Sequence, residues 1–266
     1  MKWGRLDAAQ LPLERGVDAN AWDGSQRTPL HWALQEGRLE AAQLLLERGA
    51  DANALDGSGR TPFGWALQEG RLEVVQLLLD RGAYSDTQDD SSQTPLHLAS
   101  QERRVQVSQL LLNHGAYVNV RDGSKRTPLH RASQEGHLEA IDLLLENGAY
   151  PNARDEYKRT PLHWASQGGR LDSAQLVLDR GAYANTPDAS GQTPLHLTSR
   201  EGRLEVAQLL LERGVYTDTW NGSDRTPLAQ GIGNIDTRNY EGRTPSQEAS
   251  AAGHYNITQL LLQHGG

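Results

Sequence analysis

The side chains best able to do chemistry in this chain of 266 residues are nine histidines and 34 aspartates and glutamates. Imidazoles and carboxylates serve acid–base catalysis and bind metal ions, so their spacing is tested first. Five histidines lie at multiples of 33 residues from one another: His31, His97, His130, His163 and His196. If each period forms one layer of helices, neighbouring copies stand roughly 10 Å apart. That is too far to share a metal ion whose ligands lie about 2 Å away. We therefore expect structural histidines and no metal site.

Motifs that would make this chain an enzyme are missing from its sequence. It contains no GxSxG, HExxH, GxxxxGK[ST] or GxGxxG motif. The absence of cysteine excludes thiolate catalysis and Cys-ligated zinc. The acidic residues recur with the period on helix surfaces, whereas an acid–base pair would be unique. We expect no enzyme activity, no catalytic residue and no cofactor.

The charge of the chain restricts its partners. The formal net charge is −8, and nucleic-acid binding requires a basic surface. Arginines do stand before most Thr-Pro pairs, but glutamine replaces them at Gln93 and Gln192. No apolar run approaches the ~18 residues of a membrane span, and the N-terminus lacks a secretory apolar region. We expect an intracellular, cytoplasmic protein that binds neither nucleic acid nor membranes.

The elements that position these side chains follow from a repeat. Thr-Pro pairs begin at residues 28, 61, 94, 127, 160, 193 and 226, always 33 residues apart, and an eighth begins at residue 244. In one period, Thr28 is placed to cap a helix and Pro29 to start it. Gly37 can end that helix in the left-handed conformation. A second helix begins at Leu39 and stops at Gly49. Two helices of about ten residues cannot bury their own apolar faces, so neighbouring periods must stack.

The repeated motifs resemble those of ankyrin repeats over nearly the whole chain. Thr-Pro-Leu-His begins at residues 28, 94, 127, 160 and 193, and Leu-Leu-Leu runs and Gly-Ala-Asp or Gly-Ala-Tyr segments recur in register. The resemblance implies an all-α solenoid of stacked helix–turn–helix units with short β-hairpin loops. It also implies that the histidines hydrogen-bond neighbouring hairpins and that hairpin tips and first helices line a concave groove.

Both ends of the array depart from the pattern. We predict a truncated first repeat (1–22), six complete repeats (23–220), a degenerate repeat without helices (221–238) and a final partial repeat (239–266). Pro12 falls inside a helix of the first repeat, where proline costs ~3 kcal/mol. That repeat is a decayed end repeat, a mispredicted start of the chain or the cut edge of a longer protein. Inside the array, Arg103 replaces a left-handed glycine at a cost of ~1 kcal/mol, and Phe63-Gly64 replaces the Leu-His pair.

The degenerate repeat leaves a face that must be covered. The helices of the repeat that starts at Asp188 end in three leucines whose outer face normally rests on a next pair. Each leucine contributes ~1.5–3 kcal/mol when fully buried. We therefore expect the final helices, 245–252 and 255–264, to pack directly against residues 193–213, with residues 229–239 as an irregular loop.

Partner-binding candidates are surface positions that vary between repeats. The first-helix position after the histidine and the hairpin tips vary most, and they hold residue types common in interface hot spots. The candidates are Trp22, Trp32, Trp65, Arg121, Arg131, Arg154, Tyr157, Trp164 and Trp220. A second interpretation is that the first-helix tryptophans only pack on adjacent hairpins. A row of tyrosines also has two interpretations, since the rings either pack locally or form an aromatic strip that binds a partner. These residues are Tyr84, Tyr117, Tyr150, Tyr183 and Tyr216.

Taken together, these features favour a monomeric protein-interaction scaffold that binds an unidentified partner protein through its concave face and hairpin tips. The alternative is a sensor or targeting fragment of a larger multidomain protein.

Overall fold

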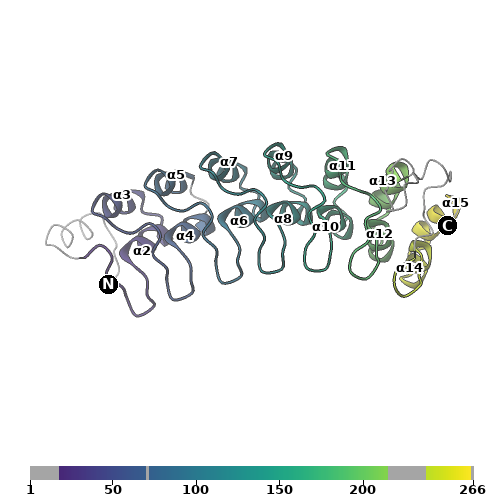
Figure 1. Ribbon diagram of the computed structural model, residues 1–266, viewed down its shortest axis with the longest axis horizontal. Coiled ribbons are helices and arrows are strands. Elements are labelled where there is room, and N and C mark those ends of the chain that lie inside the picture. Colours follow the sequence, from purple (N-terminus) through teal and green to yellow (C-terminus); the bar gives the residue numbers. More distant parts are fainter. Residues whose placement is uncertain (1–17, 70–71, 215–237, 265–266) are drawn as a thin grey trace, which may run out of the picture. The chain divides into compact units, whose positions relative to one another are not determined.

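The computed structural model describes residues 18–69, 72–214 and 238–264 (Figure 1). Within these ranges the chain is helical, and no strand is assigned. Its contacts divide it into two compact units, residues 1–123 and 124–266, which are described separately. The predicted six consecutive helix pairs are confirmed, and a seventh pair follows them.

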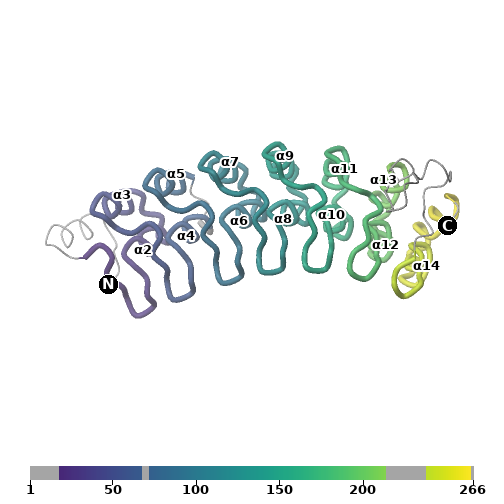
Figure 2. The backbone as a smooth tube through the Cα atoms, viewed as in Figure 1, coloured from purple at the N-terminus to yellow at the C-terminus, as the bar shows by residue number. Residues whose placement is uncertain are grey.

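Among its described residues, the first unit contains three helix pairs. They are α2 (Pro29–Gln35) and α3 (Leu39–Glu47), α4 (Pro62–Glu69) and α5 (Leu72–Asp80), and α6 (Pro95–Gln101) and α7 (Val105–Asn113). The first helices of the pairs pack on one another in order, and so do the second helices. Long loops project from the side of the first helices, away from α3, α5 and α7 (Figures 1 and 2).

The described part of the second unit repeats this arrangement with four pairs. They are α8 (Pro128–Glu135) and α9 (Leu138–Glu146), α10 (Pro161–Gly168) and α11 (Leu171–Asp179), α12 (Pro194–Glu201) and α13 (Leu204–Gly214), and α14 (Pro245–Ala251) and α15 (Tyr255–Gln263). Again α8, α10, α12 and α14 pack in sequence, with the second helices behind them.

The helix ends follow the local sequence as expected. In α2, Thr28 is the extended N-cap residue and Pro29 is the first helical residue, where its missing N–H costs nothing. Gly37 takes a φ of 65° after the helix, the left-handed conformation that ends a turn without steric cost. At the equivalent position of α6, Arg103 is forced to a φ of 59°, so the predicted strain is present.

The core lies between the helix layers. Leu30, Ala33 and Leu34 share one face of α2 and are all buried, as their i, i+3, i+4 spacing predicts. Helices α4, α6, α8, α10 and α12 bury the same three positions, and alanine, valine and leucine side chains of the second helices are buried behind them.

The final helix pair packs directly on the preceding one, as predicted. Helix α14 lies against α12, and α15 lies against α13. This contact covers the leucine run of α13, in which Leu209, Leu210 and Leu211 are all buried. From the other side Ala249 and Leu261 are buried in the same layer. The expected irregular loop, the degenerate repeat and most of the truncated first repeat lie outside the described residues.

Candidate protein-interaction surface

Five of the described hairpin tips are shaped by an aspartate. The Oδ1 atom of Asp56 accepts hydrogen bonds from the backbone N–H groups of Ser58 (2.8 Å) and Arg60 (3.0 Å). Asp23, Asp89, Asp155 and Asp188 accept the same pair of bonds from residues two and four positions on. Adjacent tips are also joined through the backbone, as in the bond from Gly57 N–H to the Ser25 carbonyl (3.0 Å). The loops therefore project as fixed turns that can display side chains.

Buried histidines connect several repeats to the repeat that follows. In the first unit the Nδ1 atom of His31 accepts from the Thr28 amide at 3.1 Å, and its Nε2 atom lies 3.2 Å from the Arg60 carbonyl. Because an amide only donates and a carbonyl only accepts, the ring is neutral with its proton on Nε2. In the second unit His130, His163 and His196 make the same bridge. The role implied by the family resemblance is thus present in the geometry.

Burial keeps His31 and His163 uncharged at neutral pH. Burial lowers the pKa of His163 to about 4, against the hydrogen bond to Gln192, which raises it. Burial also lowers the pKa of His31. A neutral imidazole with both nitrogens engaged is a structural element, because it has no free nitrogen with which to accept or deliver a proton.

The first-helix tryptophans are tied to the aspartates of their own hairpins. The indole N–H of Trp65 donates to Oδ2 of Asp56 at 2.9 Å, and Trp164 donates to Oδ2 of Asp155 at 3.1 Å. Trp32 donates in the same way to the exposed Asp23. Burial opposes ionisation of Asp56, but the hydrogen bonds from Arg60 and Trp65 hold its pKa below the usual value.

Arginines before the Thr-Pro pairs stack on the same indole rings. The guanidinium of Arg60 lies 4.1 Å from the ring centroid of Trp65, and that of Arg27 lies 4.5 Å from it. In the second unit, Arg126 lies 4.0 Å from the Trp164 centroid. Contacts of this length are cation–π interactions. The second interpretation of the tryptophans, packing on adjacent hairpins, therefore describes their contacts.

The sequence carries a signal for this stacking that type and spacing alone did not reveal. Each of the three first-helix tryptophans, Trp32, Trp65 and Trp164, lies in a repeat with arginine before its Thr-Pro pair. Where glutamine precedes the pair, the same position is Leu98 or Leu197. The converse does not hold, because Arg131, Gln230 and Glu248 also follow an arginine. The indole thus occurs only where the arginine is present, which marks the arginines as partners of the tryptophans.

The candidate residues differ widely in exposure. Trp65 is only 7% exposed, so it offers little surface to a partner, whereas Trp32, Arg131 and Trp164 are half-buried. At the tips of the first unit Trp22 is 69% exposed and Leu55 is 55% exposed. The other described tip candidates are exposed as well: Arg121 in the first unit, and Arg154 and Tyr157 in the second. Trp220 lies outside the described residues.

The tyrosines of the row come shortly after the second helices, and their described side chains are exposed. Tyr84 and Tyr117 in the first unit and Tyr150 and Tyr183 in the second are all more than half exposed, and Tyr216 lies outside the described residues. Their backbones are fixed by side chains of the preceding repeat. Asn53 accepts from the Tyr84 amide and donates to the Gly82 carbonyl. The exposure excludes burial of these rings in a local core.

Asp86 interrupts this series of asparagines. Its carboxylate accepts from the Tyr117 amide at 3.1 Å, but a carboxylate cannot donate to the nearby Gly115 carbonyl as the asparagines do to theirs. Burial raises the pKa of Asp86, against the hydrogen bond from Tyr117.

Metal clusters and membrane-spanning helices are absent from the described residues, 18–69, 72–214 and 238–264. No group of three or more His, Cys, Asp or Glu side chains in these ranges could hold a metal ion. In the same ranges no helix has the length and apolar character needed to cross a membrane.

Comparison with known proteins identifies one family model. The model described as ankyrin repeats (3 copies) matches residues 1–89, 84–155, 149–221 and 185–266, which together span the chain. A search of the curated proteins finds no match.

Proposed function

The chain belongs to the ankyrin repeat family, and we propose that it is a scaffold that binds a partner protein through its hairpin tips and first helices. Ankyrin repeats are in general protein–protein interaction modules and are typically not catalytic. The finer statement, that the hairpin side of these repeats is the binding face, rests on the side chains displayed there.

The observation that carries the proposal is the exposure of large side chains at rigid tips. Trp22 and Leu55 stand at successive tips of the first unit, and both are more than half exposed. Exposed apolar groups held by fixed turns can bury area against a partner with little loss of conformational freedom. In the second unit the displayed tip residues are Arg154 and Tyr157. Such tips suit a partner with apolar and acidic side chains.

The test compares proteins captured from a cell extract by three forms of the intact chain. The tip variant carries Trp22→Ala, Leu55→Ala and Tyr157→Ala. The control variant carries Tyr255→Ala and Leu262→Ala, which remove exposed apolar groups (78% and 57%) outside the tips. Quantitative mass spectrometry should find proteins retained by the wild type and the control and lost from the tip variant. Equal retention by the tip variant would exclude the tips as the binding face.

Once a partner is identified, single substitutions locate the main contacts. Trp22→Ala should weaken binding by ~2 kcal/mol, about thirtyfold, if that tip is a hot spot. Trp65→Ala should instead lower stability with little direct effect on affinity, because that ring is buried among its own hairpins. Titration calorimetry and thermal unfolding of each variant separate the two effects.

A further inference from the structure

One repeat of the first unit lacks the histidine bridge. Gly64 stands where His31 stands one repeat earlier, so no ring joins this repeat to the next. The two groups that a ring would engage are still present. They are the Thr61 amide and the Gln93 carbonyl. Within the described residues no hydrogen bond reaches the Thr61 amide, and the Gln93 carbonyl accepts only from the Asp89 amide.

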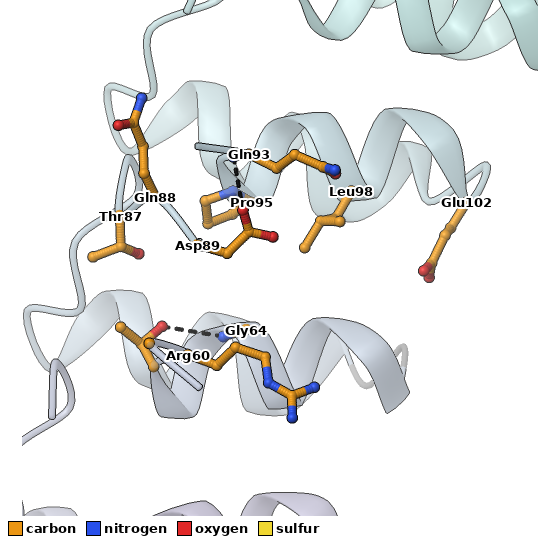
Figure 3. Close-up of a pocket in the computed structure, with 11 residues that line it drawn as sticks. Arg60, Gly64, Thr87, Gln88, Asp89, Gln93, Pro95, Leu98 and Glu102 are labelled. Carbon is orange, nitrogen blue, oxygen red and sulfur yellow. Dashed lines mark hydrogen bonds between the residues drawn. The ribbon is translucent and has the colours of Figure 1, made fainter. Parts of the chain in front are cut away.

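A cavity of about 240 Å³ lies at this position, between α4 and α6 (Figure 3). Gly64 and Thr61 line it on one side, and Gln93, Pro95 and Leu98 line it on the other. The neighbours have not closed the space. A Cβ atom added to Gly64 would find its nearest heavy atom, Oγ1 of Thr61, at 3.9 Å. Leu98, which stands where three other repeats have tryptophan, forms part of the cavity wall.

The polar groups of the cavity define a complementary ligand. One edge offers an N–H donor from Thr61, and the opposite edge offers the second lone pair of the Gln93 carbonyl. The buried Oε1 atom of Gln93 is a further acceptor with no hydrogen-bond partner. Pro95 and Leu98 add apolar surface suited to a flat ring. Neutral imidazole has one acceptor nitrogen and one N–H donor on opposite sides of such a ring.

We propose that this cavity is a binding site for a neutral imidazole-type ring, which completes the bridge that Gly64 leaves open. The imidazolium ion is excluded, because its two N–H groups would place a donor against the Thr61 amide. The ring can come from a free azole or from a histidine side chain of another protein. This proposal does not depend on the binding face proposed above.

The probe is imidazole itself, added near pH 8 to the intact ¹⁵N-labelled chain and followed by amide chemical shifts. A ligand of this size should bind with a Kd of about 1 mM. Saturable shifts should appear at the Thr61 and Gly64 amides. 1-Methylimidazole, which lacks the N–H donor, should bind at least tenfold more weakly, and so should imidazole near pH 5, where most of it is protonated.

Two variants locate the site. Gly64→His fills the cavity with the chain's own ring and should abolish the shifts. His31→Gly opens a second cavity with matching donors and acceptors and should raise the stoichiometry from one to two. Acetyl-histidine-methylamide then distinguishes the two possible sources of the ring. If it binds as tightly as imidazole, the natural ligand is a histidine side chain of another protein. If it does not bind, the ligand is a free azole. Absent or non-saturable shifts, or equal binding of 1-methylimidazole, would overturn the proposal.

Discussion

Replacement of His163 by glutamine separates the hydrogen-bonding role of the bridge from its protonation. The ring of His163 is fully buried between the Thr160 amide and the Gln192 carbonyl. The chain itself shows how glutamine behaves at this position. In the final pair Oε1 of Gln247 accepts from the Thr244 amide at 3.0 Å. His163→Gln should therefore keep the contact with Thr160 and lose the bond to the next repeat.

At pH 7 the substitution should lower the free energy of unfolding by ~1–3 kcal/mol, because the buried Gln192 carbonyl loses a donor. The difference in stability between the wild type and the variant becomes smaller at acidic pH. The pKa of histidine is ~6.5 in the unfolded chain and about 4 for folded His163. Below pH 6.5 the unfolded state takes up a proton that the folded state does not. The free energy of unfolding therefore decreases as the pH is lowered. At ~1.4 kcal/mol per pH unit, the wild type loses ~2 kcal/mol through His163 by pH 5.

The variant has no such proton to take up, so its deficit at pH 7 should nearly vanish at pH 5. Urea unfolding followed by circular dichroism at both pH values measures the difference, fitted with nearest-neighbour coupling between repeats. The other histidines titrate alike in both proteins and cancel. His264→Gln, at an exposed position, is the control and should show no pH-dependent difference. A deficit for His163→Gln that is the same at pH 5 and pH 7 would refute the assignment of a neutral bridging ring.

Four further substitutions test three other features by the same urea unfolding. Asp86→Asn should stabilise the chain by ~1 kcal/mol at pH 7, because the amide can donate to the Gly115 carbonyl, and an unchanged midpoint would contradict this. Arg103→Gly should stabilise by a similar ~1 kcal/mol by removing strain at a positive φ, and a loss of stability would show that the side chain contributes more than the strain costs. Trp65→Phe should cost ~1–3 kcal/mol, because a buried carboxylate loses its donor. Trp32→Phe should cost much less, since its carboxylate partner is exposed, so equal losses would refute the role of burial.

Local sequence signals were sufficient for the helices and their ends. The Thr28-Pro29 pair and Gly37 each act within one turn of helix, so their conformations follow from residue type alone. The docking of the final pair was also predictable, because the leucine run of α13 requires a cover. These inferences needed no knowledge of how a neighbouring repeat is placed.

The candidate site was less predictable because exposure depends on the neighbouring repeat. Trp32 and Trp65 occupy equivalent positions, but Trp65 is covered by the guanidinium of Arg27 from the preceding repeat. Variable positions considered one at a time cannot show that an arginine covers a tryptophan. The repeats in which glutamine replaces the arginine also have leucine in place of the tryptophan, and this joint change could have indicated the contact. The cavity beside Gly64 was visible only as a departure from the motif. Its size depends also on Leu98, one repeat away.

The missing bridge at Gly64 also bears on how the first unit responds to mechanical load. Force applied along the chain passes through every contact between successive repeats in series. The contact between α2 and α4 includes the His31 bond to the Arg60 carbonyl, whereas the contact between α4 and α6 has no equivalent bond. Under tension the first unit should therefore separate between α4 and α6 before it separates between α2 and α4. A ring bound in the cavity would raise the force needed, which makes the tensile strength of this contact adjustable by a ligand.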